Sequence, residues 1–264
     1  MRTIIRQIGI SSRESTLASV HAMMNRIPMV NTRIEHLYLH KDILREAGTL
    51  PIGSVEFMRT AMKLTNICEP DNLSYPEALH PFLHRKMQQV PAGSVLGTCF
   101  VKPVTTKRFT GFVFDPMQDP SLLSAHDQEQ HQAFLSMNPA EMVWIGEPVV
   151  FMSEYRFYIT EGRLLGEGRY DDGPEDAPKP DLQQVTQMIS TMTQTNKAPA
   201  AYSLDIGVLA TGETALVECN DAWAIGYYTG SVSREDFLEM LWTRWHQLLT
   251  VPRQPILSSS NTQS

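Results

Sequence analysis

The chain has little cysteine and no long apolar run. Its 264 residues include only three cysteines, Cys68, Cys99 and Cys219, which lie far apart and form no CxxC pair. This spacing argues against a thiolate metal site, and an odd, small number of cysteines suits a reducing compartment. No apolar run reaches 18 residues, and the N-terminal segment carries Arg2 and Arg6 without the apolar core of a signal peptide. We therefore expect a cytoplasmic protein without a membrane partner.

An excess of basic residues is also missing, as are several catalytic signatures. The formal net charge of −7 argues against a nucleic-acid partner. The Walker A pattern GxxxxGK[ST] is absent, and we find no Ser/His/Asp triad or glutaminase cysteine motif. The apolar fraction of 42% and the charged fraction of 19% are typical of a globular chain with a substantial core. The sequence leaves the oligomeric state open.

The most informative stretch is the predicted hairpin Tyr202–Asn220. Two apolar, β-branched runs flank Thr211-Gly212, a turn dipeptide. With a two-residue loop, Asp205 lies directly opposite Glu218, and their Cβ atoms are about 4.5–5.5 Å apart on one face. Asn220 shares that face because side chains alternate along a strand. Two carboxylates and an amide so close together suit Mg²⁺, which prefers hard oxygen ligands.

The same pairing gives the hairpin a second face, which we expect to be buried. Two alternatives to this hairpin stay open. A loop of odd length would shift the pairing of Asp205 with Glu218, and the stretch could also be a surface hairpin with scattered acids. The expected core face consists of Ile206, Val208, Ala215, Val217 and Cys219.

A second polar stretch follows the predicted strand Cys99–Pro103. Lys102 stands at the end of this strand, and the loop Thr105–Gly111 is rich in hydroxyl and basic side chains. A lysine beside such a loop suits a polyphosphate cradle, and a solvated hairpin tip is the alternative.

Another hairpin is predicted to turn at Glu161-Gly162. A two-residue turn places Glu154 opposite Arg169 and Arg156 opposite Glu167. Such pairs are ordinary cross-strand ion pairs, or else Arg156 meets a phosphate.

The N-terminal part alternates strand and helix patterns. An apolar run in residues 1–10, helical spacing from Ser11 to Ile27 and a strand pattern at Ile34–Leu39 predict a small α/β lobe. A capping box at Ser74–Glu77, with proline in the first turn, predicts a helix to about Gln88.

Three segments in a fixed order carry a resemblance to a known family. They are FVKP at residues 100–103, EPVVFMSEYRFYI at 147–159 and LDIGVLATGETALVECN at 204–220. Together they resemble the ATP-grasp superfamily, most closely its compact bacterial and phage-type members. The resemblance implies an α+β fold in which two α/β lobes with antiparallel sheets clamp a nucleotide, preceded by a small α/β N-terminal lobe. The implied division is residues 1–80 for that lobe, 81–150 and 151–251 for the two subdomains, and 252–264 for a flexible tail.

The resemblance also implies ATP as a cofactor and places its contacts. The phosphates would meet a strand end and the mobile loop after it: Lys102, Lys107, Thr110 and Gly111. The adenine and the ribose would meet the interlobe linker and the following strand: Glu147, Val149 and Glu154.

The same resemblance implies Mg²⁺ as a second cofactor, held by Asp205, Glu218 and Asn220. Lys102 and Arg156 would be catalytic, with Arg156 balancing charge on the γ-phosphate or on an acyl phosphate. These metal ligands agree with the geometry derived from the hairpin.

The chain departs from the family pattern at three places. The usual loop over the phosphates has more glycine than Thr105–Gly111 offers. The earlier nucleotide-contacting lysine of many members is not obvious, and Arg85 or Lys86 would take its place. After Asn220, the usual glycine-rich ending is replaced by DAWAIGYY at residues 221–228, which we expect to shape the acceptor site.

These features lead to one main hypothesis. It is an ATP- and Mg-dependent carboxylate–amine ligase that forms an amide or peptide bond through an acyl phosphate. The substrates would be small-molecule or peptide carboxylates and amines. The alternatives are an ATP-dependent kinase of a small molecule and a non-catalytic nucleotide-binding regulatory or interaction protein.

Overall fold

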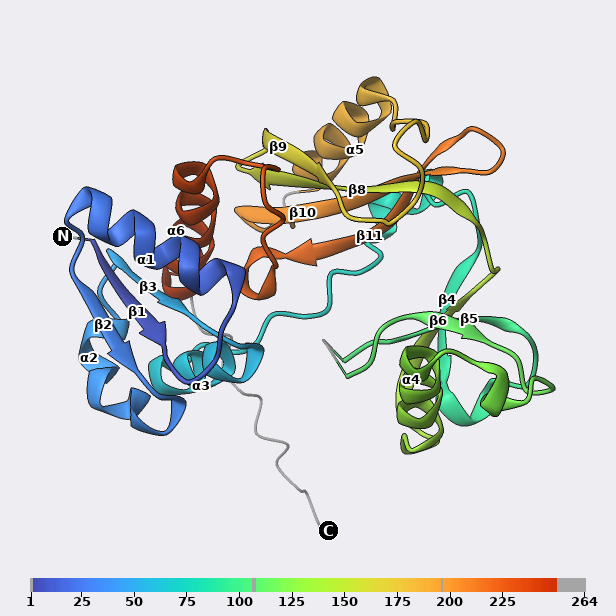
Figure 1. Cartoon of the computed structure of the whole chain (residues 1–264), viewed down its shortest axis with the longest axis horizontal. Coiled ribbons are helices and arrows are strands. Elements are labelled where there is room, and N and C mark those ends of the chain that lie inside the picture. Colours follow the sequence, from blue (N-terminus) through green and yellow to red (C-terminus); the bar gives the residue numbers. More distant parts are fainter. Residues whose placement is uncertain (1, 106–107, 196, 251–264) are drawn as a thin grey trace, which may run out of the picture. The chain divides into compact units, whose positions relative to one another are not determined.

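A computed structural model describes residues 2–105, 108–195 and 197–250, which form two compact units (Figure 1). Of the described residues, the first unit contains 2–70 together with 234–250, and the second lies within Asp71–Ser233. The last described helix therefore belongs to the first unit. The expected boundaries at residues 80 and 150 stay predictions.

The first unit is built on a parallel sheet with the strand order β2-β1-β3. Its strands are β1 (Thr3–Gln7), β2 (Met29–Thr32) and β3 (Thr49–Ile52). Its helices are α1 (Arg13–Asn25), η1 (Ile34–His40), α2 (Lys41–Leu44), α3 (Val55–Thr65) and α6 (Arg234–Thr250). Figure 1 shows α1 and α6 on one side of this sheet and α2 and α3 on the other, as parallel sheets require.

The β-α-β opening is confirmed, but the predicted second strand at Ile34–Leu39 is wrong. That segment is the 3-10 helix η1, and the strand lies earlier, at Met29–Thr32. Strand β2 pairs with β1 from Ile4↔Met29 to Gln7↔Thr32. Pairing with a distant strand therefore decided the position, which local apolar spacing alone could not.

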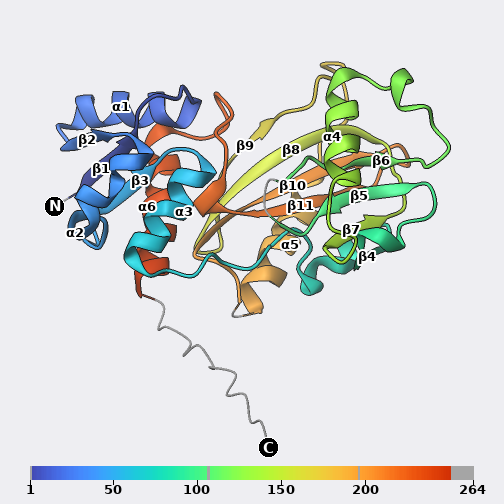
Figure 2. The ribbon, with the colours of Figure 1, turned by 90° about the horizontal axis from the view of Figure 1, so that it is seen from below.

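The second unit contains two antiparallel sheets (Figure 2). The first has the order β11-β10-β8-β9, and the second has the order β4-β7-β5-β6. The first consists of β8 (Phe151–Thr160), β9 (Arg163–Arg169), β10 (Ala201–Leu209) and β11 (Thr214–Asp221). The second consists of β4 (Met87–Pro91), β5 (Cys99–Pro103), β6 (Phe112–Phe114) and β7 (Met142–Gly146). The helices are η2 (Glu77–Phe82), η3 (Ala92–Ser94), η4 (Pro120–Leu122), α4 (Ala125–Leu135), α5 (Leu182–Gln194) and η5 (Ala222–Ala224).

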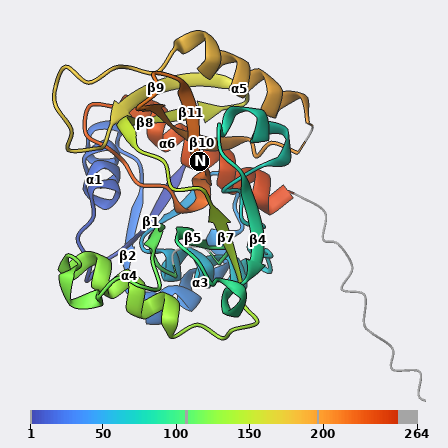
Figure 3. The same ribbon diagram turned by 90° about the vertical axis from the view of Figure 1, so that its right-hand side faces the viewer.

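Each sheet of the second unit buries one face under a helix. Phe157, Leu204 and Leu216 of the first sheet pack with Val185 and Met188 of α5, which lies along the sheet in Figure 3. The second sheet packs against α4 through a cluster that contains Val101, Phe112, Phe114, Phe134 and Val143. Because side chains alternate along a strand, the neighbours of these core residues point to the opposite face of each sheet.

The predicted helix from Ser74 to about Gln88 is wrong. Only Glu77–Phe82 is helical, as the 3-10 helix η2, and Met87–Pro91 is the strand β4. Strand β4 pairs with β7 from Met87↔Gly146 to Pro91↔Met142.

Over the part of the chain that the structure describes, no helix has the length and apolar character needed to cross a membrane.

Candidate active site

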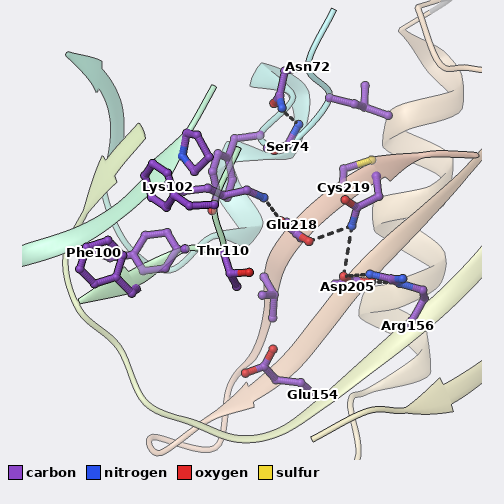
Figure 4. A pocket seen from close by; sticks show the side chains of 18 of the residues that line it. Asn72, Ser74, Phe100, Lys102, Thr110, Glu154, Arg156, Asp205, Glu218 and Cys219 are labelled. Carbon is purple, nitrogen blue, oxygen red and sulfur yellow. Dashed lines mark hydrogen bonds and ion pairs between the residues drawn. The ribbon is translucent and has the colours of Figure 1, made fainter. Parts of the chain in front are cut away.

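A cavity of about 800 Å³ lies in the second unit, lined by residues from both of its sheets. Figure 4 shows Lys102 from β5 approaching Glu218 on β11, with Asp205 and Arg156 beyond it. Every predicted site residue that the structure describes lines this cavity: Lys102, Thr110, Gly111, Glu147, Val149, Glu154, Arg156, Asp205, Glu218 and Asn220. The remaining one, Lys107, lies outside the described residues.

The predicted pairing of Asp205 with Glu218 is confirmed, but the loop length and the register near the loop differ from the prediction. The loop has three residues rather than two, because Leu209 is bonded to Glu213 through its N–H at 2.9 Å. That loop alone would shift the register by one, as an odd loop must. A bulge between Asp205 and Ile206 shifts it back, so that Asp205 again faces Glu218.

The bulge also corrects the predicted core face. Ile206 pairs with Leu216, which leaves Val217 as the extra residue of β11. Val217 is half-buried and lines the cavity, whereas Leu216 is fully buried in the core. Cys219 belongs to the buried core, as predicted.

Arg156 is bonded to Asp205 rather than facing Glu167. A bulge between Tyr158 and Ile159 shifts the β8–β9 pairing, so that Arg156 lies opposite Gly168 and the predicted cross-strand pairs are wrong. On its other side, Arg156 pairs with Asp205 of β10. Its Nε and Nη2 donate to the two oxygens of Asp205 at 2.7 and 2.6 Å.

Five polar side chains form one continuous chain of contacts, drawn as dashed lines in Figure 4, and we call them the floor of the cavity: Lys102, Glu218, Asn220, Asp205 and Arg156. The Nδ2 of Asn220 donates to Asp205 at 3.1 Å and to Glu218 at 2.9 Å. Glu218 forms an ion pair with Lys102 of the other sheet. Asn220 therefore holds two carboxylates together that would otherwise repel each other, and a cation flanks each of them.

Burial lowers the pKa of Lys102 to about 8, against the field of Asp205, and Arg156 and Arg85 add to the lowering. Burial raises the pKa of Glu154, although the hydroxyl of Tyr170 donates to this carboxylate at 2.5 Å. Such perturbed groups in one cavity are typical of functional sites.

The donor set of the floor fits a divalent cation. Asp205, Glu218 and Asn220 supply hard oxygen atoms and are linked through one amide group. Within the described ranges no group of three or more His, Cys, Asp or Glu side chains suits a metal. Asp205, Glu218 and Asn220 therefore remain the predicted ligands of Mg²⁺.

Arg85 and the interlobe linker form another wall. Arg85 lines the cavity, whereas Lys86 is exposed and does not. The guanidinium of Arg85 donates to the carbonyls of Leu216 and Val217 at 2.8 and 3.0 Å, which supports the bulge. The linker between β7 and β8 contains Glu147, which accepts a hydrogen bond from the backbone N–H of Lys86 at 3.3 Å.

The segment 226–232 contributes Tyr228 to an aromatic wall of the cavity, and Tyr170 forms the other half of this wall. The rings of Tyr228 and Tyr170 are stacked with centroids 5.4 Å apart, and the guanidinium carbon of Arg156 lies 5.1 Å from the centroid of the Tyr228 ring. A Cβ atom on Gly166 or Gly168 would lie within 2.5 Å of Ser231, so only glycine lets this segment lie directly on β9. The DAWAIGYY motif indicated Tyr228, but nothing in the sequence indicated Tyr170.

The Tyr158 hydroxyl fixes this segment, which yields a first prediction. It donates to the carbonyl of Gly226 and accepts from the N–H of Tyr228, both at 3.1 Å. In Tyr158→Phe these backbone groups lose their partner, so we expect the Tyr228 amide to exchange about tenfold faster. Hydrogen-exchange mass spectrometry measures this. The control Tyr38→Phe alters an exposed ring in the first unit, and equal rates in both variants would contradict the assignment.

A second prediction concerns acid stability. Hydrogen bonds from Arg169, at 2.7 and 2.6 Å, hold the pKa of Asp171 well below its ordinary value, and the carboxylate also accepts from the N–H of Glu154. A depressed pKa stabilises the fold above the unfolded-state pKa of about 3.9, and this contribution is lost as the pH falls through the native pKa. We expect Asp171→Asn to cost about 1.5–3 kcal/mol at pH 7, and the difference from wild type to shrink below pH ~4. Urea unfolding at several pH values tests this, with the exposed Asp172→Asn as control.

The fold and the site together define a class of protein. An α+β chain in which two antiparallel sheets share one cavity, with basic groups and hard oxygen donors facing each other, has the architecture of a nucleotide clamp. The chain belongs to the ATP-grasp superfamily, because the family model "ATP-grasp domain, R2K clade family 2" matches residues 82–240. This confirms the predicted family and fold. A search of curated proteins finds no match.

Solved structures share this fold at low sequence identity. D-alanine–D-alanine ligase from Bacillus anthracis is 12% identical with a TM-score of 0.52, over 94% of this chain and 98% of that one. The D-cycloserine synthetase DcsG is 12% identical with a TM-score of 0.56, over 93% and 99%. The ATP-grasp ligase PsnB, solved with a minimal precursor, Mg and ADP, is 11% identical with a TM-score of 0.51, over 92% and 98%. At this identity the likeness shows the fold alone.

Proposed function

We propose that the protein is an ATP- and Mg²⁺-dependent carboxylate–amine ligase that works through an acyl phosphate. The observation that carries this proposal is that Lys102, Arg85 and Arg156 line the same cavity as the oxygen donors Asp205 and Glu218. The ligase and synthetase names of the fold neighbours, with PsnB also solved with a precursor peptide, support small-molecule or peptide substrates.

The chemistry requires that a carboxylate become a good acylating agent. The carboxylate oxygen bonds to the γ-phosphorus, and ADP leaves. The amine nitrogen then attacks the acyl carbon of this acyl phosphate, the bond from that carbon to the phosphate oxygen breaks, and inorganic phosphate leaves. The nitrogen gives up a proton to solvent as the amide forms. ATP is needed because a bare carboxylate has no adequate leaving group.

The residues of this chain position the reactants and neutralise charge. Lys102 and Arg85 would bind the polyphosphate, and Arg156, held by Asp205, would face the transferred phosphoryl group. Asp205, Glu218 and Asn220 would hold Mg²⁺, which when bound neutralises phosphate oxygens. Glu147, Val149 and Glu154 would contact the adenosine, and Thr110 and Gly111, with Lys107, would cover the phosphates.

ADP release from Mg-ATP, screened with pooled amino acids and peptides, tests the proposal. We expect release only when an acid and an amine are both present. Release with a single non-carboxylate acceptor would instead show a kinase. Nucleotide binding without release under any of these conditions would favour a regulatory module.

A further inference from the structure

Two ion pairs in the cavity involve the proposed metal ligands, and they differ in kind. Arg156 and Asp205 are bonded at two points between adjacent strands, and the Asp205 side chain is only 2% exposed. Lys102 and Glu218 instead connect β5 of one sheet with β11 of the other, and their side chains are 15% and 23% exposed. The first pair is part of the framework, whereas the second is open to the cavity.

We propose that Lys102 and Glu218 are exchangeable counter-ions, so that the protein binds a nucleotide polyphosphate and a divalent cation together and either one alone only weakly. This inference rests on the proposed function and adds to it a coupling between two ligands. Lys102 binds phosphate when Glu218 binds the metal ion, so each of the two side chains keeps an opposite charge beside it.

The surroundings of Lys102 explain why it cannot lose Glu218 without a replacement. Its Nζ lies 5.5 Å from the centroid of the Tyr75 ring, and burial lowers its pKa, against the field of Asp205, with Arg156 and Arg85 adding to the lowering. A metal ion at Glu218 without a phosphate would leave this ammonium group without a carboxylate partner. A partly buried, unpaired charge is costly.

The surroundings of Glu218 impose a similar cost when a polyphosphate binds without a metal ion. A polyphosphate bound to Lys102 without a metal ion would leave Glu218 with only the amide of Asn220, at 2.9 Å. The carboxylate would then face the negative charge of the phosphates at close range. Each ligand therefore removes the penalty that the other one meets, which is positive cooperativity.

Binding of ADP and of Mn²⁺, each alone and together, tests the exchange by calorimetry and by electron paramagnetic resonance. For Glu218→Gln we expect ADP without metal to bind about tenfold tighter than to wild type, because Lys102 is released. For Lys102→Met we expect Mn²⁺ without nucleotide to bind about tenfold tighter, because Glu218 is released. Lys86→Met and Glu213→Gln make the same charge changes on exposed side chains outside the cavity and should change neither affinity.

The double variant Lys102→Met/Glu218→Gln separates exchange from simple repulsion. If the gain for ADP comes from a released Lys102, it disappears in the Lys102→Met background. If ADP affinity still rises in that background, or does not rise in Glu218→Gln, the proposed exchange is wrong. Binding of Mg-ADP to wild type would then still support the nucleotide site. No binding of Mg-ADP to folded wild type would instead refute the proposed function itself. Should Glu218→Gln fail to fold, Glu218→Asp keeps the charge but shortens its reach, and the same gain is expected.

Discussion

Replacing Asp205 with alanine is expected to lower the free energy of unfolding of the second unit by about 3–5 kcal/mol. Asp205 is 1% exposed as a whole residue and accepts both hydrogen bonds that Arg156 donates at 2.7 and 2.6 Å. In the wild type, burial opposes the charged form of Arg156, but Asp205 keeps the pKa of Arg156 above its ordinary value. In the variant this support is gone, yet the guanidinium stays charged because arginine does not lose its proton at neutral pH. The cost arises because this cation then has no carboxylate partner. Urea unfolding at neutral pH measures it.

The double variant Arg156→Met/Asp205→Leu is the matched comparison. It removes both charges and leaves no unpaired cation, so we expect it to lose clearly less stability than Asp205→Ala alone. A loss below about 1 kcal/mol for Asp205→Ala would show that the pair behaves as a solvent-exposed ion pair.

Replacing Glu218 with alanine is expected to reduce Mg-ATP-dependent ADP release about a hundredfold or more, because charge stabilisation of phosphoryl transfer is lost. Glu218 is the carboxylate that stands opposite Asp205 and next to the amide of Asn220. Steady-state ADP release with the acid–amine pair found in the screen measures the effect. Titration with nucleotide in the presence of Mg²⁺ shows whether binding is weakened as well.

Glu213→Ala is the control for this experiment. Glu213 belongs to the same hairpin, but its side chain is 54% exposed and it does not line the cavity. We expect the turnover of this variant to stay within about twofold of wild type, since exposed ion pairs contribute little. Equal losses in both variants would indicate damage to the hairpin rather than to the site.

The hairpin Tyr202–Asn220 shows how far local reasoning reaches. The alternation of side chains placed Asp205, Glu218 and Asn220 on one face, and the structure brings the three into hydrogen-bond contact. The assumed two-residue loop was wrong, and the bulge beside Asp205 restored the pairing. A bulge has no clear local signature here, because it depends on support from elsewhere, including the hydrogen bonds from Arg85 to β11.

The helix expected from Ser74 to about Gln88 failed for a related reason. Its capping pattern lies in the sequence, but η2 starts after Pro76 without a side-chain cap, and the residues from Met87 pair with β7, more than fifty positions along the chain. Local propensity is a weak preference, and pairing within a buried sheet overrides it. The same applies to Ile34–Leu39, where a predicted strand is the 3-10 helix η1.

By itself, the sequence determined the family and most of the charged residues that line the cavity. Motif order and the two-residue period of strands are properties of the chain alone, and they sufficed to select Lys102, Arg156 and Glu218. Only the tertiary structure decided the partners of these groups: Asp205 for Arg156, Glu218 for Lys102, and Tyr170 beside Tyr228. These contacts join strands and loops far apart in the sequence, and their positions depend on bulges and on sheet pairing that no local pattern encodes.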